Sequence, residues 1–114
     1  MADPLVPVER RALVRQRTFL GGRICYGPKH VISVECGIRN LTSRGAMLRV
    51  PADQPLPPAF TLLHVSEAVA FDARLTWRRG ETLGVSFEGR HDLRGSVDEE
   101  FKALRAIWAA LAAA

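Results

Sequence analysis

The chain has 114 residues, 47% hydrophobic and 25% charged, with a net charge of +4 and two cysteines. This length suits a single domain, and the balance of apolar and charged residues favours a packed core over global disorder. No apolar run approaches the roughly 20 residues of a membrane span. Residues 1–8 lack the pattern of a secretory signal, so we expect a cytoplasmic protein that neither crosses nor binds a membrane.

The positive charge is concentrated in one part of the chain. Residues 10–49 contain nine basic residues and one acidic residue, a net charge of +8, and the remainder carries −4. Fourteen of the sixteen basic residues are arginine, whose planar fork matches phosphate groups and guanine edges. A partner that carries phosphate is expected, although a general preference for arginine would give the same composition.

Apolar side chains recur at every second residue from about Thr18 onward, as half-buried strands require. Two strands are especially clear, with inward sets Ile32, Val34, Cys36, Ile38 and Val69, Phe71, Ala73, Leu75, Trp77. Four prolines in residues 51–58 mark a loop. About six short strands with short connections predict a mainly β fold, a small six-stranded antiparallel β-barrel over residues 18–88.

An amphipathic helix is predicted over residues 96–112. Ser96 and Glu99 have the spacing of a capping box, and the apolar residues Val97, Phe101, Leu104, Trp108 and Leu111 fall on one face. This stripe is expected to pack on its own barrel, closing an end away from the ligand. Pairing with the helix of a second chain is the alternative, so both a monomer and a weak homodimer stay open.

The sequence shows no catalytic or metal-binding signature. Cys25 and Cys36 lie in predicted strands and are expected to be reduced core thiols, and the three histidines are scattered. Phosphate-binding loops, nucleophile elbows and paired acids are missing. We therefore expect no enzyme, no cofactor and no metal site.

Two short motifs remain. Arg11 and Arg15 form an RxxxR element before the first strand, and Asn40, Thr42 and Gly45 form an NxTxxG turn after the second. Together with the strand pattern, over about residues 9–88, they make the chain resemble the PilZ domain family of bacterial cyclic di-GMP receptors. The resemblance implies a flexible leader (1–8) and a PilZ-like domain (9–113) with a ligand-binding arm (9–17).

The resemblance also implies roles for these residues. Arg11 and Arg15 would pair a guanine Hoogsteen edge and a phosphate, while Asn40 would accept hydrogen bonds from the opposite guanine edge. Thr42 would offer a hydroxyl, and Gly45 would allow a positive φ and a close ligand approach. Arg10 adds a charge that would favour a stacked ligand pair. Asn40 and Thr42 replace the family's usual Asp and Ser.

The implied function is a non-enzymatic receptor that passes the cyclic di-GMP signal to an unidentified effector protein. One alternative is a PilZ-like adaptor with weak or no nucleotide binding, although such members usually lose one of the two motifs. A nucleic-acid-binding barrel is less favoured, because most aromatic residues fall on inward faces, leaving Phe19 and Tyr26 as possible stacking platforms.

Overall fold

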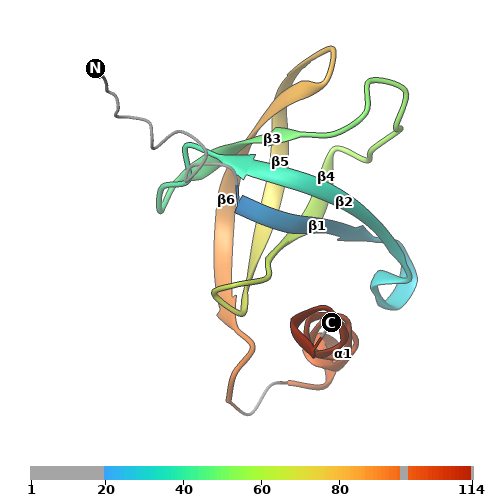
Figure 1. The fold of residues 1–114 in the computed structure, drawn as a ribbon, viewed down its shortest axis with the longest axis vertical. Coiled ribbons are helices and arrows are strands. Elements are labelled where there is room, and N and C mark those ends of the chain that lie inside the picture. The colour runs from blue at the N-terminus through green and yellow to red at the C-terminus, as the bar shows by residue number, and fades with distance from the viewer. Residues whose placement is uncertain (1–19, 96–97, 114) are drawn as a thin grey trace.

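The computed structural model describes residues 20–95 and 98–113, which form a closed barrel of six antiparallel strands followed by one α-helix (Figure 1). The strands are β1 (Leu20–Tyr26), β2 (Ile32–Arg39), β3 (Gly45–Arg49), β4 (Ala59–His64), β5 (Val69–Arg79) and β6 (Thr82–Asp92). Their order around the barrel is β1-β2-β3-β6-β5-β4, and β4 pairs with β1 to close it. The predicted barrel is confirmed, although β6 extends beyond the expected end at residue 88.

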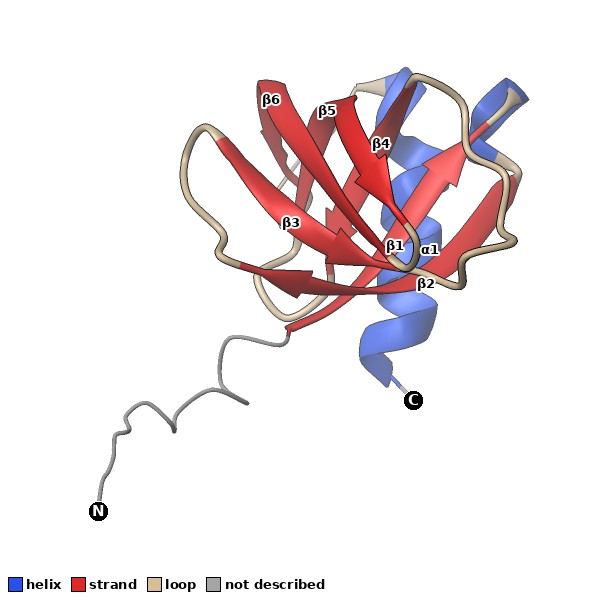
Figure 2. Ribbon diagram, turned by 90° about the horizontal axis from the view of Figure 1, so that it is seen from above, coloured by secondary structure: helices blue, strands red, loops and turns tan. Residues whose placement is uncertain are grey.

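The barrel interior is filled by the inward-facing residues of all six strands. Ile24, Ile38, Leu48, Leu62 and Leu83 have no exposed surface, and Phe71 stacks on Phe87 with ring centroids 4.1 Å apart. Each such side chain stabilises the fold by roughly 1.5–3 kcal/mol when fully buried. The pairing of β4 with β1 closes the sheet around this small core (Figure 2).

The C-terminal helix covers an outer face of the barrel. A 3₁₀ turn, η3 (Glu99–Phe101), leads into α1 (Lys102–Ala113). The apolar side of this segment, made of Phe101, Leu104, Ile107, Trp108 and Leu111, packs on Cys25, Leu63, Ala68, Ala70 and Leu93. Because Cys25, Leu63 and Ala70 alternate with the inward residues of their strands, they face outward. The helix packs on its own barrel as expected, but it covers the side rather than closing an end.

The helix start differs from the predicted capping box. Ser96 and Val97 lie outside the described residues, and Asp98 occupies the cap position without a side-chain hydrogen bond to the helix. Helical structure begins at Glu99, three residues later than predicted. Within residues 20–95 and 98–113, no helix has the length and hydropathy needed to cross a bilayer.

Trp77 does not point into the core, contrary to the prediction. The register of β5 against β6 shifts between Leu75, which pairs with Val85, and Trp77, which pairs with Gly84. This bulge leaves Thr76 as an extra residue and moves the following side chains to the opposite face. Trp77 is therefore 44% exposed.

The alternation also fails at the start of β2. Ile32, predicted to be inward, is 43% exposed, and the preceding Val31 is 73% exposed. Both follow the 3₁₀ turn η2 (Pro28–His30), where β2 pairs with β1 but not yet with β3. The two-stranded ribbon extends past the barrel there, so it has no interior to face.

Candidate ligand-binding site

Residues 40–45, which join β2 to β3, form a tight turn that we call the 40–45 turn. The Thr42 amide donates to the Gly45 carbonyl at 2.9 Å. The Thr42 hydroxyl oxygen lies 3.1 Å from the Arg44 amide and 3.3 Å from the Gly45 amide, and accepts from both. The hydroxyl predicted to meet a ligand thus closes the turn, and its contact with a ligand stays a prediction.

Asn40 presents its side-chain oxygen from an unusual backbone conformation. Its φ is +50°, in the left-handed region that asparagine tolerates better than most residues. The Asn40 amide nitrogen donates to the Met47 sulfur at 3.5 Å. Within the described part of the chain, Oδ1 of Asn40 has no hydrogen bond, so it is placed to accept one.

Gly45 is needed for a different reason from the one predicted. Its φ is not positive; the left-handed residue of this turn is Asn40. A Cβ on Gly45 would instead collide with the carbonyl oxygen of Val85 in β6. The neighbouring Arg44 carbonyl accepts from the Phe87 amide at 2.8 Å, which draws the two strands together. Gly45 therefore allows β3 to approach β6.

A groove of about 370 Å³ lies between the 40–45 turn and the β5–β6 hairpin. It is lined by Asn40, Thr42, Arg44, Gly45, Ala46 and Met47 on one side, and Thr76, Trp77, Gly84 and Val85 on the other. A Cβ on Gly84 would collide with the Trp77 indole nitrogen, so the indole lies directly on the β6 backbone. The Thr76 hydroxyl donates to the Gly84 carbonyl at 3.0 Å and fixes the bulge. Trp77 thus presents a flat, exposed aromatic surface.

The arginines near the groove have different surroundings. Arg44 is exposed at the groove, and its guanidinium makes no hydrogen bond or ion pair with the described residues. Arg78 donates to the carbonyls of Gln54, at 2.7 Å, and Pro51, at 2.9 Å, and so holds the proline-rich loop. The bulge explains this, because it turns Arg78 toward the end of the barrel. Arg44 therefore lines the groove, whereas Arg78 does not.

The arm residues Arg10, Arg11 and Arg15 lie outside the described residues. Their attachment point is defined, however, because Leu20 begins β1 and pairs with Ile38, two residues before Asn40. Strand spacing and rise put the Leu20 and Asn40 backbones about 8 Å apart. The segment that carries the RxxxR element therefore joins the barrel beside the 40–45 turn.

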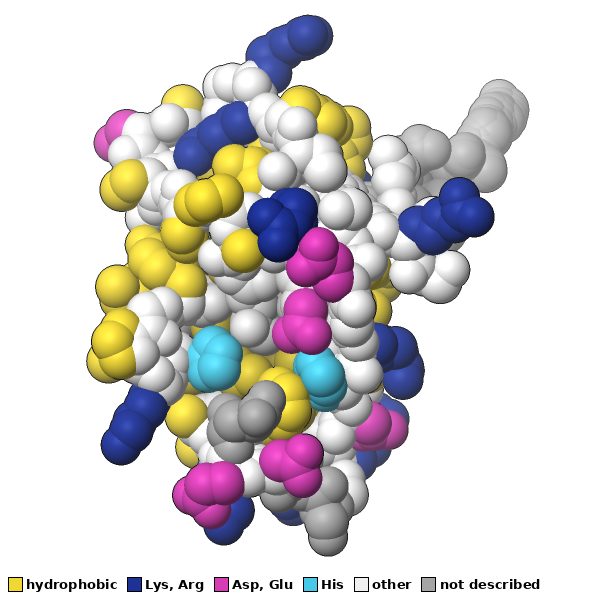
Figure 3. All heavy atoms as spheres, turned by 180° about the vertical axis from the view of Figure 1, so that it is seen from behind, with side chains coloured by type: hydrophobic (Ala, Val, Ile, Leu, Met, Phe, Trp, Pro, Cys, Tyr) yellow, Lys and Arg dark blue, Asp and Glu magenta, His cyan; other side chains and the backbone are white. Residues whose placement is uncertain are grey.

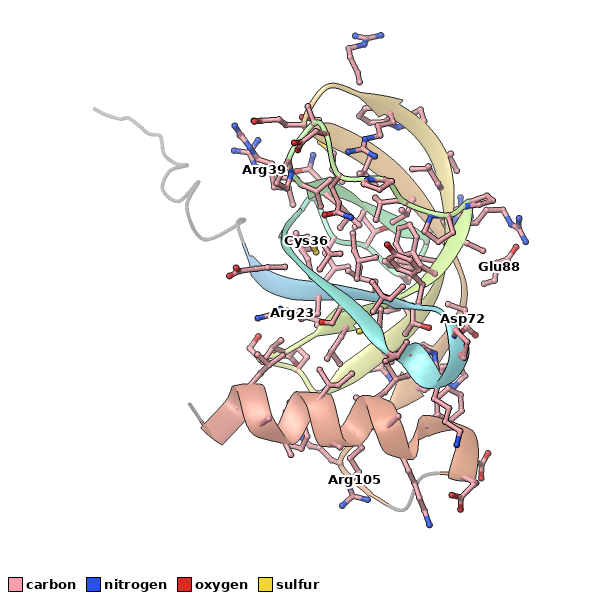
Figure 4. The ribbon with its side chains drawn as sticks, turned by 90° about the vertical axis from the view of Figure 1, so that its right-hand side faces the viewer. Arg23, Cys36, Arg39, Asp72, Glu88 and Arg105 are labelled. Atoms are coloured by element: carbon pink, nitrogen blue, oxygen red, sulfur yellow. The ribbon has the colours of Figure 1, made fainter. Side chains whose placement is uncertain are left out.

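Charged side chains lie on both sides of the barrel. Figure 4 places Arg23 and Arg39 on the side where β1 begins, and Asp72 and Glu88 on the opposite side. Asp72 lies 2.9 Å from His91, and Glu88 lies 3.0 Å from Arg74. The face in Figure 3 accordingly mixes acids, histidines and bases. Among the described residues, no group of His, Cys, Asp and Glu is suited to hold a metal ion.

Sequence reasoning favoured a core position for Trp77 and did not consider Arg44 or Met47, although all three line the groove. Met47 lies between the inward Ala46 and Leu48, so the alternation could have placed it outside beside Asn40. No family model matches the chain, and no curated protein or solved structure is significantly similar to it.

Proposed function

We propose that the protein is a non-enzymatic receptor that binds cyclic di-GMP between its N-terminal arm and the 40–45 turn, and passes the signal to a partner protein. The observation that carries the proposal is the position of the groove. It combines an aromatic surface, a free amide oxygen and an arginine beside the strand into which the RxxxR element leads.

The chemistry of the groove suits a guanine nucleotide. The exposed face of Trp77 offers a stacking surface, and base stacking on an aromatic side chain contributes about 1–3 kcal/mol. Oδ1 of Asn40 can accept from the donor edge of guanine, and Arg44 can pair with a phosphate. All three residues line the same groove.

The arm has the length to complete this site. Arg15 lies five residues before Leu20 and Arg11 nine residues before it. An extended chain spans at most about 3.6 Å per residue, so the two positions reach up to about 18 and 32 Å from β1. Both reaches exceed the distance of about 8 Å from Leu20 to Asn40 estimated from strand geometry. Arg11 and Arg15 can therefore bind the same ligand as the groove.

Single-stranded nucleic acid is the second candidate, which the exposure of Trp77 favours. Such binders stack successive bases on several aromatic side chains along a basic groove. Phe60 and Phe71 are buried in the barrel, and Phe101 and Trp108 pack between helix and barrel. Trp77 thus has no aromatic neighbour along its groove among the described residues, so a single nucleotide ligand fits better.

Calorimetric titration of the full chain with cyclic di-GMP, GMP and a single-stranded oligonucleotide tests the proposal. Arg11→Ala and Arg15→Ala should each weaken cyclic di-GMP binding by about 2–4 kcal/mol, because each removes charge-assisted contacts. Arg94→Ala, at an exposed arginine away from the groove, is the charge-matched control and should change little. If both arm variants bind like the parent, or the oligonucleotide binds more tightly, the proposal is wrong.

A further inference from the structure

We propose that the barrel alone, without the arginines of the arm, holds one guanine mononucleotide in the groove. In this arrangement Arg44 binds the phosphate, and Met47 fixes the orientation of the Asn40 amide that reads the base. The inference deepens the proposed function, on which its choice of guanine rests.

The size of the groove points to one nucleotide unit. Ligand sites in proteins measure about 300–1,000 Å³, and this groove, at about 370 Å³, stands at the small end of that range. It suits a base with its sugar and phosphate better than a whole cyclic dinucleotide. The second half of a cyclic dinucleotide must then be bound by residues outside the groove. In the proposed function, the arginines of the arm bind it.

Met47 decides which end of the Asn40 amide faces the ligand. A thioether sulfur accepts hydrogen bonds and has no hydrogen to donate, so it faces the NH₂ group of Asn40, 3.5 Å away. The opposite end, Oδ1, is left to accept. Guanine offers two adjacent N–H donors, N1 and N2, on its Watson–Crick edge, whereas adenine offers one donor, N6, beside an acceptor at ring nitrogen N1. Met47 is thus a positioning residue for the preference for guanine over adenine.

Because residue 40 is an asparagine, its side-chain amide must be held in one orientation to present an acceptor. A carboxylate would present an acceptor in either orientation, whereas an amide presents an acceptor in only one of two. Trp77 cannot make the choice, because stacking on an aromatic face accepts every base. The discrimination between bases therefore depends on the contact between Asn40 and Met47.

The backbone of Arg44 is held by two hydrogen bonds. Its amide donates to the Thr42 hydroxyl at 3.1 Å, and its carbonyl accepts from the Phe87 amide at 2.8 Å. The side chain therefore leaves a well-held turn at the groove, and its guanidinium has no partner within the described ranges. An arginine in this setting can form charge-assisted hydrogen bonds to a phosphate without breaking another contact.

The test uses the full chain carrying Arg11→Ala and Arg15→Ala together, titrated with GMP, guanosine and AMP. Tryptophan fluorescence reports base stacking on Trp77, since the other tryptophan, Trp108, packs between helix and barrel. We expect GMP to bind this double variant as it binds the parent. Guanosine and AMP should each bind about tenfold more weakly, because each lacks one charge-assisted or base-specific contact.

Single substitutions separate the phosphate contact of Arg44 from the positioning role of Met47. Arg44→Gln should remove the preference for GMP over guanosine, while Met47→Leu, close in volume, should reduce only the preference for GMP over AMP. Arg94→Gln is the control that should change neither ratio. Loss of GMP binding from the double arm variant, or unchanged ratios in both groove variants, would overturn the inference.

The same titrations keep this inference distinct from the proposed function. If the parent binds cyclic di-GMP no more tightly than GMP, the receptor function is wrong while the mononucleotide site stands. If cyclic di-GMP binds through Arg11 and Arg15, but GMP binding requires them too, the receptor function stands and the separate site in the barrel is refuted.

Discussion

Replacing Trp108 with alanine should weaken the packing of the helix on the barrel and so lower the free energy of unfolding. Trp108 packs on the outer face of the barrel, and its indole nitrogen donates to the Val65 carbonyl at 2.8 Å. Losing the hydrogen bond costs about 1 kcal/mol, and removing a half-buried indole costs about 2 kcal/mol, half the usual value for a buried one. The free energy of unfolding should fall by about 3 kcal/mol. For a domain of this size the melting temperature then drops by about 12 °C.

Thermal melts at several protein concentrations, with the mass measured in solution, provide the assay. Trp77→Ala makes the same chemical change at an exposed indole and should cost about 1 kcal/mol or less. Trp108→Phe keeps the ring packing and should lose only about 1 kcal/mol with the hydrogen bond. Equal losses for Trp108→Ala and Trp77→Ala would refute the argument. So would conversion of a dimer into a stable monomer, which would show that the helix pairs chains.

Three further predictions follow from single residues. Gly45→Ala should lower the free energy of unfolding by about 1–3 kcal/mol in denaturant melts, since its Cβ meets the β6 backbone, whereas Gly21→Ala meets nothing within 4 Å and should be neutral. Burial lowers the pKa of His64 below its usual 6.5, so the unfolded state binds more protons as the pH falls below about 6.5. Stability should decrease with falling pH in that window, and His64→Gln should flatten the profile. Arg10→Ala should change the calorimetric stoichiometry from two cyclic di-GMP per chain to one; one ligand in the parent, or two in the variant, would contradict this role.

The barrel was predictable because each strand shows its inward face in the sequence of that strand alone. Side chains alternate along a strand with period two, so inward residues such as Ile24 and Leu62 show the strands directly. The bulge at Thr76 was not predictable, because it depends on how β5 registers against Gly84 in β6. One unpaired residue reversed the expected direction of Trp77, and with it the composition of the groove.

The place of the turn motif in the fold was predictable, but the contacts that each of its residues makes were not. The turn motif located Asn40, Thr42 and Gly45 correctly at the end of β2. Their spacing could not show that the Thr42 hydroxyl closes the turn, or that Gly45 is small because of β6, since both depend on neighbours distant in sequence or on backbone geometry. The roles of Arg10, Arg11 and Arg15 stay predictions.

The two cysteines lie on opposite sides of the same two-stranded ribbon. Both thiols are free and buried, as predicted, with Cys36 inside the barrel and Cys25 beneath the helix. Burial raises the pKa of Cys25, and raises that of Cys36 to about 12, so both react slowly with alkylating reagents while the fold is intact. Undocking of α1 uncovers Cys25 and leaves Cys36 enclosed. Their separate labelling rates therefore distinguish the opening of the helix layer from the opening of the barrel, without any added probe.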